Sequence, residues 1–316
     1  MPNTDSRANR LGFAYFALLA ATLIVQYTAA FAIARFAPAL AEADGYTWLL
    51  SLLPIYCVGL PLCLAILRPC PAEPAPARPL RAGHWWLALL ISLGLMFFGN
   101  LIGNALMMLV AALRGVEMVN PVQEAILDAD PVWTAVATVI AAPLGEEFLF
   151  RRLIIDRTRR YGELPAVLLS ATMFGAFHLN FYQFFYAFLI GLVFGYVYVK
   201  TGRLRCTIAL HAAINFLGGV IAPALLRALM PLLERLQSGD DLLEPVMLLS
   251  QLPLLFLYLA YAALLFGCAM ATVVIAIVAH RQLTFAPGEG GRALRRAPTI
   301  IAFFALCAVM AVIAMR

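Results

Sequence analysis

Long apolar segments without charge dominate the pattern of this chain and predict helices that cross a membrane. The first, residues 11–34, follows Arg7 and Arg10 and contains no charged side chain. At about 1.5 Å per residue it can cross about 30 Å of hydrocarbon, and it is longer than the apolar core of a cleaved export signal. Eight further apolar segments follow, at residues 46–67, 85–113, 132–155, 164–179, 181–199, 206–226, 246–279 and 299–315.

These nine segments predict an all-α, polytopic bundle of eight to nine transmembrane helices, because lipid leaves no partner for unpaired backbone groups outside a helix. The segment at 164–179 is short. The segment at 246–279 is longer than one upright helix needs, and we expect Pro253 to divide it into an interfacial turn and a span. We expect three parts: N-terminal helices at 1–131, a catalytic core at 132–228 and C-terminal helices at 229–316.

The charged residues between the predicted spans are distributed unequally over the two sides of the membrane. With successive connections assigned to alternate sides, 17 Lys and Arg fall on one side and 5 on the other, together the 22 of the chain. Connections rich in Lys and Arg usually face the cytoplasm. We therefore expect a multi-pass protein of a bacterial-type inner membrane, with its N-terminus cytoplasmic and its C-terminus on the opposite side.

The composition agrees with a membrane protein and excludes several other classes. Hydrophobic residues make up 64% of the 316 positions and charged residues 12%, about half the usual charged share of a soluble domain. The net charge of +5 reflects the uneven arginines, so we expect no nucleic-acid partner. The six cysteines form no CxxC pair, which argues against a disulfide framework or a thiolate metal site.

Two glycine pairs and one proline-rich connection also carry structural information. Gly99 and Gly103, like Gly191 and Gly195, are four residues apart in predicted spans, and such spacing lets helices approach closely. We expect them to pack helices within this protein. The connection at 68–81 contains five prolines and predicts a stiff, extended segment.

Two adjacent carboxylates, Glu146 and Glu147, stand inside the fourth predicted span. A charge at the centre of a membrane helix costs about 2.5–3.5 kcal/mol on insertion scales, so such residues are functional hypotheses by default. Glu147 and Arg151 are four apart and can pair on one helix face. Glu146 is rotated by about 100° and has Phe150 at its own i+4 position, so it lacks a local cation and suits proton chemistry. The alternative is an ion pair that only locks helices together.

Two of the four histidines and one asparagine join these acids in later spans. His178 ends the fifth predicted span, and His211 shares a face of the seventh with Asn215. Counted from the expected cytoplasmic boundary, Glu146 lies about 16 Å deep, His178 about 21 Å, His211 about 9 Å and Asn215 about 15 Å. Helix tilt can absorb part of this spread, so we expect spans four, five and seven to bring these groups together.

The three motifs Glu146-Glu147-x-x-x-Arg151, Phe174-x-x-x-His178 and His211-x-x-x-Asn215, in this order, resemble those of the CAAX-protease and bacteriocin-processing family of intramembrane proteases. This family includes type II CAAX prenyl endopeptidases and Abi-type proteins. The resemblance covers residues 142–216. The family often has glycine after the motif arginine, where this chain has Arg152.

The resemblance implies hydrolysis of a peptide bond within the membrane by an activated water. In that scheme Glu146 and His178 position and deprotonate the water. His211 and Asn215 stabilise the tetrahedral oxyanion, while Glu147 and Arg151 support the site. The substrate is then a membrane-associated peptide or a lipidated protein, and membrane lipid is the second partner.

A metal is the open point of this scheme. Glu146, His178 and His211 could hold Zn²⁺ with a free position for water. The chain has no His-Glu-x-x-His helix, however, and these ligands come from three separate spans. We favour a metal-free site in which a glutamate activates the water.

Two other classes of function also fit intramembrane acids and histidines. A proton-coupled transporter or channel uses such groups as a proton relay. A non-catalytic scaffold of the same family would keep the polar cluster for structure alone. Loss of cleavage on substitution of Glu146, flux across liposomes and retained partner binding distinguish the three.

Overall fold

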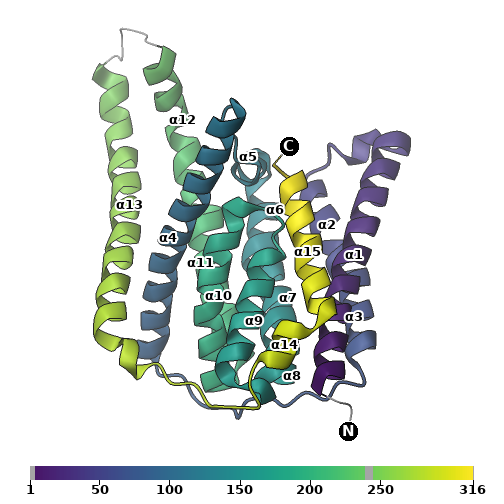
Figure 1. Ribbon diagram of the computed structural model, residues 1–316. Coiled ribbons are helices and arrows are strands. Elements are labelled where there is room, and N and C mark those ends of the chain that lie inside the picture. The colour runs from purple at the N-terminus through teal and green to yellow at the C-terminus, as the bar shows by residue number, and fades with distance from the viewer. Residues whose placement is uncertain (1–3, 239–244, 316) are drawn as a thin grey trace.

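A computed structural model describes residues 4–238 and 245–315 of the chain. Within these residues, seven helical segments are long and apolar enough to cross a membrane, and two shorter apolar helices accompany them. They stand side by side in a helical bundle (Figure 1). The start of α1 and the end of α15 lie at opposite ends of this bundle, as an odd number of spans requires. The predicted all-α, polytopic architecture is therefore confirmed.

The helices follow the predicted apolar segments, but the seventh continues past its predicted end at Leu226 to Ser238. Four of the seven long spans are single helices. The other three, which are the second, fourth and seventh of the nine predicted segments, are built from consecutive short helical pieces that include π-helix. The single helices and the two shorter ones are α1 (Thr4–Phe36), α4 (Ala82–Arg114), α9 (Glu163–Ala176), α10 (Phe181–Thr201), α13 (Pro245–Ala279) and α15 (Pro298–Ile313). The composite spans are α2 (Tyr46–Leu53), η2 (Pro54–Gly59) and α3 (Leu60–Leu67); α6 (Pro131–Ala135), η3 (Val136–Ala141), α7 (Ala142–Glu146), η4 (Glu147–Ile155), α8 (Asp156–Thr158) and η5 (Arg159–Tyr161); and α11 (Leu204–Phe216), η6 (Leu217–Ile221) and α12 (Ala222–Ser238). Short helices in the connections are η1 (Pro38–Leu40), α5 (Pro121–Asp128), η7 (His280–Gln282) and α14 (Arg292–Arg296).

The predicted division of the eighth span at Pro253 is wrong. Helix α13 continues from Pro245 to Ala279 with Pro253 inside it. A proline removes one backbone N–H, but a membrane helix tolerates this when neighbouring helices support it. Helix α13 packs along α4.

Helix α10 lies between α4 and α9, and the predicted glycine pairs allow both contacts. A Cβ on Gly99 would stand 2.3 Å from Cα of Tyr186, and one on Gly103 would stand 2.9 Å from the Phe181 carbonyl oxygen. On the other side, Gly195 of α10 meets Val167 of α9 at 2.9 Å. At Gly99 and Gly103 the two backbones approach so closely that only glycine fits, whereas the close neighbour of Gly195 is a side chain.

The fifth span ends earlier than predicted. Helix α9 stops at Ala176, and residues 177–180 form a tight turn into α10. Leu179 has φ 57°, a left-handed conformation that is uncommon for a non-glycine residue. Asn180 then caps α10 by accepting a hydrogen bond from the Gln183 N–H at 2.8 Å. His178 consequently lies in a turn, whereas the prediction placed it in the last part of a helix.

Two long connections cross the end of the bundle where α1 begins (Figure 1). The 68–81 segment is extended from residue 71 onward, and Glu73 N–H donates to the Asp156 carbonyl at 2.6 Å. The segment after η7 is anchored by the Glu163 N–H, which donates to the Ala286 carbonyl at 3.0 Å. These bonds fasten both connections to the ends of the fourth and fifth spans.

The glycine contacts predict a difference between two matched substitutions. Gly99→Ala should lower the free energy of unfolding by about 1–3 kcal/mol, because α4 must move away from the α10 backbone. Gly267 of α13 has no atom within 4 Å of a built Cβ, so Gly267→Ala should leave stability unchanged or slightly raised. Thermal unfolding of both purified variants in detergent measures this, and equal midpoints would contradict the packing argument.

Candidate functional site

A fully buried ion pair joins the two ends of the first motif. Arg151 Nε lies 3.2 Å from Glu147 Oε2, and both side chains have no solvent exposure. The predicted pairing of these residues is therefore confirmed. Arg151 also donates to Ser170 Oγ at 3.0 Å, and its guanidinium stands 4.6 Å from the centre of the Phe174 ring. A buried charge pair of this kind needs every partner, because removing one leaves the other charge uncompensated.

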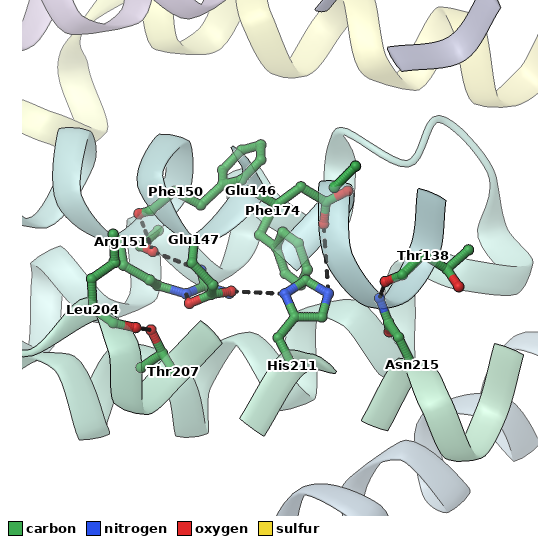
Figure 2. Close-up of polar contacts among 12 residues, drawn as sticks. Thr138, Glu146, Glu147, Phe150, Arg151, Phe174, Leu204, Thr207, His211 and Asn215 are labelled. Atoms are coloured by element: carbon green, nitrogen blue, oxygen red, sulfur yellow. Dashed lines mark hydrogen bonds and ion pairs between the residues drawn. The ribbon is translucent and has the colours of Figure 1, made fainter. Parts of the chain in front are cut away.

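His211 connects this pair to the second carboxylate. Its Nδ1 lies 3.0 Å from Glu147 Oε1 and its Nε2 lies 3.7 Å from Glu146 Oε2 (Figure 2). A carboxylate can only accept, so Nδ1 carries the proton and donates it to Glu147. The Nε2 atom of the same ring faces Glu146. The orientation of His211 thus follows from the buried pair behind it.

Glu146 differs from Glu147 in its surroundings. Its side chain is 25% exposed, while that of Glu147 is completely buried. Gly145, the residue before it, has no side chain, and the Tyr56 ring occupies that space so closely that a Cβ would stand 2.1 Å from it. The two adjacent acids therefore have different roles: Glu147 is committed to Arg151 and His211, while Glu146 remains accessible.

The turn after α9 directs His178 towards the same place. Its Nδ1 lies 2.9 Å from the Phe174 carbonyl oxygen, which can only accept, so Nε2 holds the lone pair of the neutral ring. His178 is close enough to Glu146 and His211 to interact with both electrostatically. The Phe174 ring lies between the two imidazoles, with centroid distances of 5.1 Å to His178 and 5.7 Å to His211.

Asn215 is bound to the backbone of the fourth span. Its Nδ2 donates to the Thr138 carbonyl at 2.7 Å (Figure 2). This carbonyl needs a partner because η3 is π-helical: Ala142 N–H bonds to the Ala137 carbonyl, and Pro143, next in that register, has no N–H. One amide hydrogen of Asn215 thus completes the backbone bonding of the helix that carries Glu146, and the second remains for other contacts.

Residues 128–217 match the family described as type II CAAX prenyl endopeptidase, Rce1-like. This part of the chain is therefore similar to the CAAX-protease family of intramembrane proteases. The matched segment contains all six site residues discussed above. Comparisons with curated proteins and with solved structures found no match for the chain.

The motif pattern of the CAAX-protease family misses several residues that the structure places around the site. Ser170 receives a hydrogen bond from Arg151 and donates to the Phe150 carbonyl at 2.7 Å. Thr207 is buried against Glu147. Their signal in the sequence is only a small polar residue inside an apolar span, which is too common in membrane helices to single them out.

Tyr186 of α10 is a further residue that sequence reasoning missed. Its hydroxyl accepts a hydrogen bond from Gln183 Nε2 at 2.8 Å, and Gln183 Oε1 accepts one from Asn180 Nδ2 at 2.8 Å. Asn180 Nδ2 also donates to the His178 carbonyl at 2.8 Å. Because the Tyr186 oxygen accepts from Gln183, its own O–H remains available as a donor, and Tyr186 interacts electrostatically with Glu146.

The proposed metal ligands do not form a metal site in this arrangement. Among residues 4–238 and 245–315, no three His, Cys, Asp or Glu side chains are placed to hold one ion. His211 Nδ1 is occupied by Glu147, and His178 Nδ1 by the Phe174 carbonyl. Both rings keep Nε2 outside these bonds, as metal-binding histidines do, so a zinc ion held by Glu146, His178 and His211 stays a prediction.

The buried pair predicts that substitution of Arg151 destabilises the protein and that the same substitution of its neighbour Arg152 does not. Arg151→Gln should lower the free energy of unfolding by about 3–5 kcal/mol, because the Glu147 charge is left buried without a counter-charge. Arg152 is exposed, so Arg152→Gln should change stability by no more than about 0.5 kcal/mol. Denaturation of the two purified variants followed by fluorescence measures both, and equal tolerance of the two changes would contradict the buried network.

Proposed function

We propose that this chain is an intramembrane endopeptidase that hydrolyses a peptide bond of a membrane-associated or lipidated substrate, with Glu146 as the general base. The observation that carries the proposal is the difference between the two adjacent acids: Glu147 is enclosed with Arg151, whereas Glu146 is partly exposed and 3.7 Å from His211. A separation of 3.7 Å is too long for a direct hydrogen bond but allows one water to bridge the two groups.

The reaction proceeds in two proton transfers. Glu146 accepts a proton from the water as its oxygen attacks the scissile carbonyl, and His178 Nε2 accepts a hydrogen bond from the same water. The tetrahedral intermediate then collapses as Glu146 returns the proton to the leaving amine. Glu147 and Arg151 act as positioning residues, because they hold His211 in the orientation that faces Glu146.

The oxyanion of the intermediate needs hydrogen-bond donors. The second amide hydrogen of Asn215 is one candidate, in agreement with the family resemblance. His211 contributes in the same scheme only when it is protonated on Nε2, because its Nδ1 proton is directed at Glu147. The free O–H of Tyr186 is an additional donor on the side of α10.

We also propose the orientation and the division of the chain. We assign the end of the bundle where α1 begins to the cytoplasm, because the predicted alternation of sides gives it 17 of the 22 Lys and Arg. The segment 132–228 is the catalytic core, and the helices at 1–131 and 229–316 enclose it. Cysteine labelling from either side of sealed vesicles tests this orientation.

The function is tested by Glu146→Gln and Glu146→Ala. Both should abolish cleavage and leave the thermal midpoint unchanged, because neither alters the Glu147–Arg151 pair. Proteomic comparison of membranes that contain wild-type or variant protein should reveal an accumulated uncleaved substrate. With that substrate purified, turnover should fall by about 10²-fold or more.

Arg152→Gln is the control for these variants. The Arg152 side chain is exposed, so this variant should cleave the substrate like wild type. Unchanged cleavage by both Glu146 variants would refute the assignment. Proton or solute flux across liposomes that disappears in these variants, with no substrate accumulating, would instead favour a transporter.

Tyr186→Phe separates an oxyanion donor from a packing residue. It should lower kcat by about 10²-fold, as expected for loss of one donor, with KM and thermal stability unchanged. Tyr182→Phe on the same helix is the control, because the Tyr182 hydroxyl donates to the Val119 carbonyl at 2.5 Å and does not belong to the site. Equal kcat values for the two variants would remove Tyr186 from the mechanism.

A further inference from the structure

A small pocket lies outside the candidate active site, at the end of the bundle where α1 begins. It is enclosed by the first turns of α1, the connection after α3 and the last turns of the fourth span. The lining includes Arg7, Leu11, Cys70, Arg157, Thr158 and Tyr161. Two arginines from helices far apart in the sequence thus face one enclosed space.

Both arginines leave a buried donor without a partner. The Nε atoms of Arg7 and Arg157 are shielded from solvent and make no hydrogen bond within the described part of the chain. Other nitrogens of these side chains have partners: Arg7 Nη1 lies 3.8 Å from Glu73 Oε1, and Arg157 Nη1 donates to the Leu153 carbonyl at 3.2 Å. An unsatisfied buried donor costs about 1–3 kcal/mol, and more on a charged group.

The nearby carboxylates do not neutralise this pair. Glu73 is about half exposed and is shared with Arg160 at 3.9 Å. Glu289 lies 2.6 Å from Arg160, whose hydrogen bond lowers the pKa of the Glu289 carboxyl. Asp156 interacts electrostatically with Arg157 but accepts its hydrogen bond from the Tyr198 hydroxyl, at 3.0 Å. The pocket therefore retains positive charge, and each of the two arginines that line it has an unused Nε–H.

We propose that this pocket binds the phosphate group of an anionic ligand between Arg7 and Arg157. A guanidinium presents a planar set of donors that matches phosphate oxygens, and each arginine here has an unused Nε–H. The pocket lies at the end of the bundle, where the headgroup region of a bilayer meets a membrane protein. The phosphate belongs either to an anionic lipid or to a free phosphate compound, and the two sources share this chemistry.

The site would also connect parts that are distant in the chain. Arg7 belongs to α1, Cys70 to the connection after α3, and Arg157 to the span that carries Glu146 and Glu147. A bound phosphate would thus fasten α1 and this connection to the end of the fourth span.

The experiment uses the full chain purified in a maltoside detergent, which contains no phosphate. The thermal midpoint is measured against increasing short-chain phosphatidylglycerol, short-chain phosphatidylcholine, inorganic phosphate and chloride. A ligand that binds only the folded state raises the midpoint in a concentration-dependent way. We expect phosphatidylglycerol or inorganic phosphate to raise the wild-type midpoint, and chloride to leave it unchanged.

Variants distinguish a binding site from a structural role. Arg7→Gln and Arg157→Gln should raise the dissociation constant at least tenfold, while Arg10→Gln, on an exposed position of α1, should bind like wild type. Arg7→Lys and Arg157→Lys keep the positive charge but lose the Nε–H, so they should also weaken binding. They replace a Gln variant that fails to fold.

The outcomes decide the proposal. A response to phosphatidylglycerol alone assigns a lipid headgroup, and a response to both phosphatidylglycerol and inorganic phosphate assigns the phosphate group itself. If neither ligand shifts the wild-type midpoint, the proposal is wrong. It is also wrong if the Arg7 and Arg157 variants show the same ligand-induced shift of the midpoint as wild type. These readouts require no substrate, so they stand apart from the test of peptide cleavage.

Discussion

The arrangement of this site depends on one charge pair in an apolar interior. Glu147 and Arg151 cannot remain charged there separately, so each requires the other together with the partners that complete their hydrogen bonds. Those partners come from different helices: Ser170 from α9 and His211 from α11. The pair therefore holds three helices in register, and the imidazole of His211 faces Glu146 as a consequence.

Departures from regular helix concentrate around the same point. The π-helical η3 and the missing N–H of Pro143 expose the Thr138 carbonyl, which Asn215 fills from the seventh span. The turn at Leu179 has a left-handed backbone that costs about 1–3 kcal/mol, and it moves His178 off the helix axis. Such irregularities persist where the surrounding contacts maintain them, which is the common situation at functional sites.

The core and the ends of the bundle use polar groups in different ways. In the interior, Glu147 and Arg151 are enclosed and paired with each other, and of their side-chain polar atoms only Arg151 Nη2 lacks a hydrogen-bond partner within the described residues. At the end where α1 begins, arginines outnumber the nearby carboxylates, and two of them share a pocket without completing their hydrogen bonds. The first pattern suits chemistry on a substrate bond, and the second suits capture of a charged group from outside.

The apolar pattern alone determined the class of fold, the location of the spans and the pairing of Glu147 with Arg151, because hydrocarbon forces helices and a four-residue spacing brings side chains together. It failed at Pro253 and at residues 177–179, since neighbouring helices and a capping asparagine decide whether a helix continues. The link from His211 to both acids, the use of Asn215 by the backbone and the surroundings of Tyr186 depended on the tertiary structure. The hydrogen bonds of His211 and Asn215 join residues about 60 to 80 positions apart, and local spacing carries no information about which faces of separate helices meet.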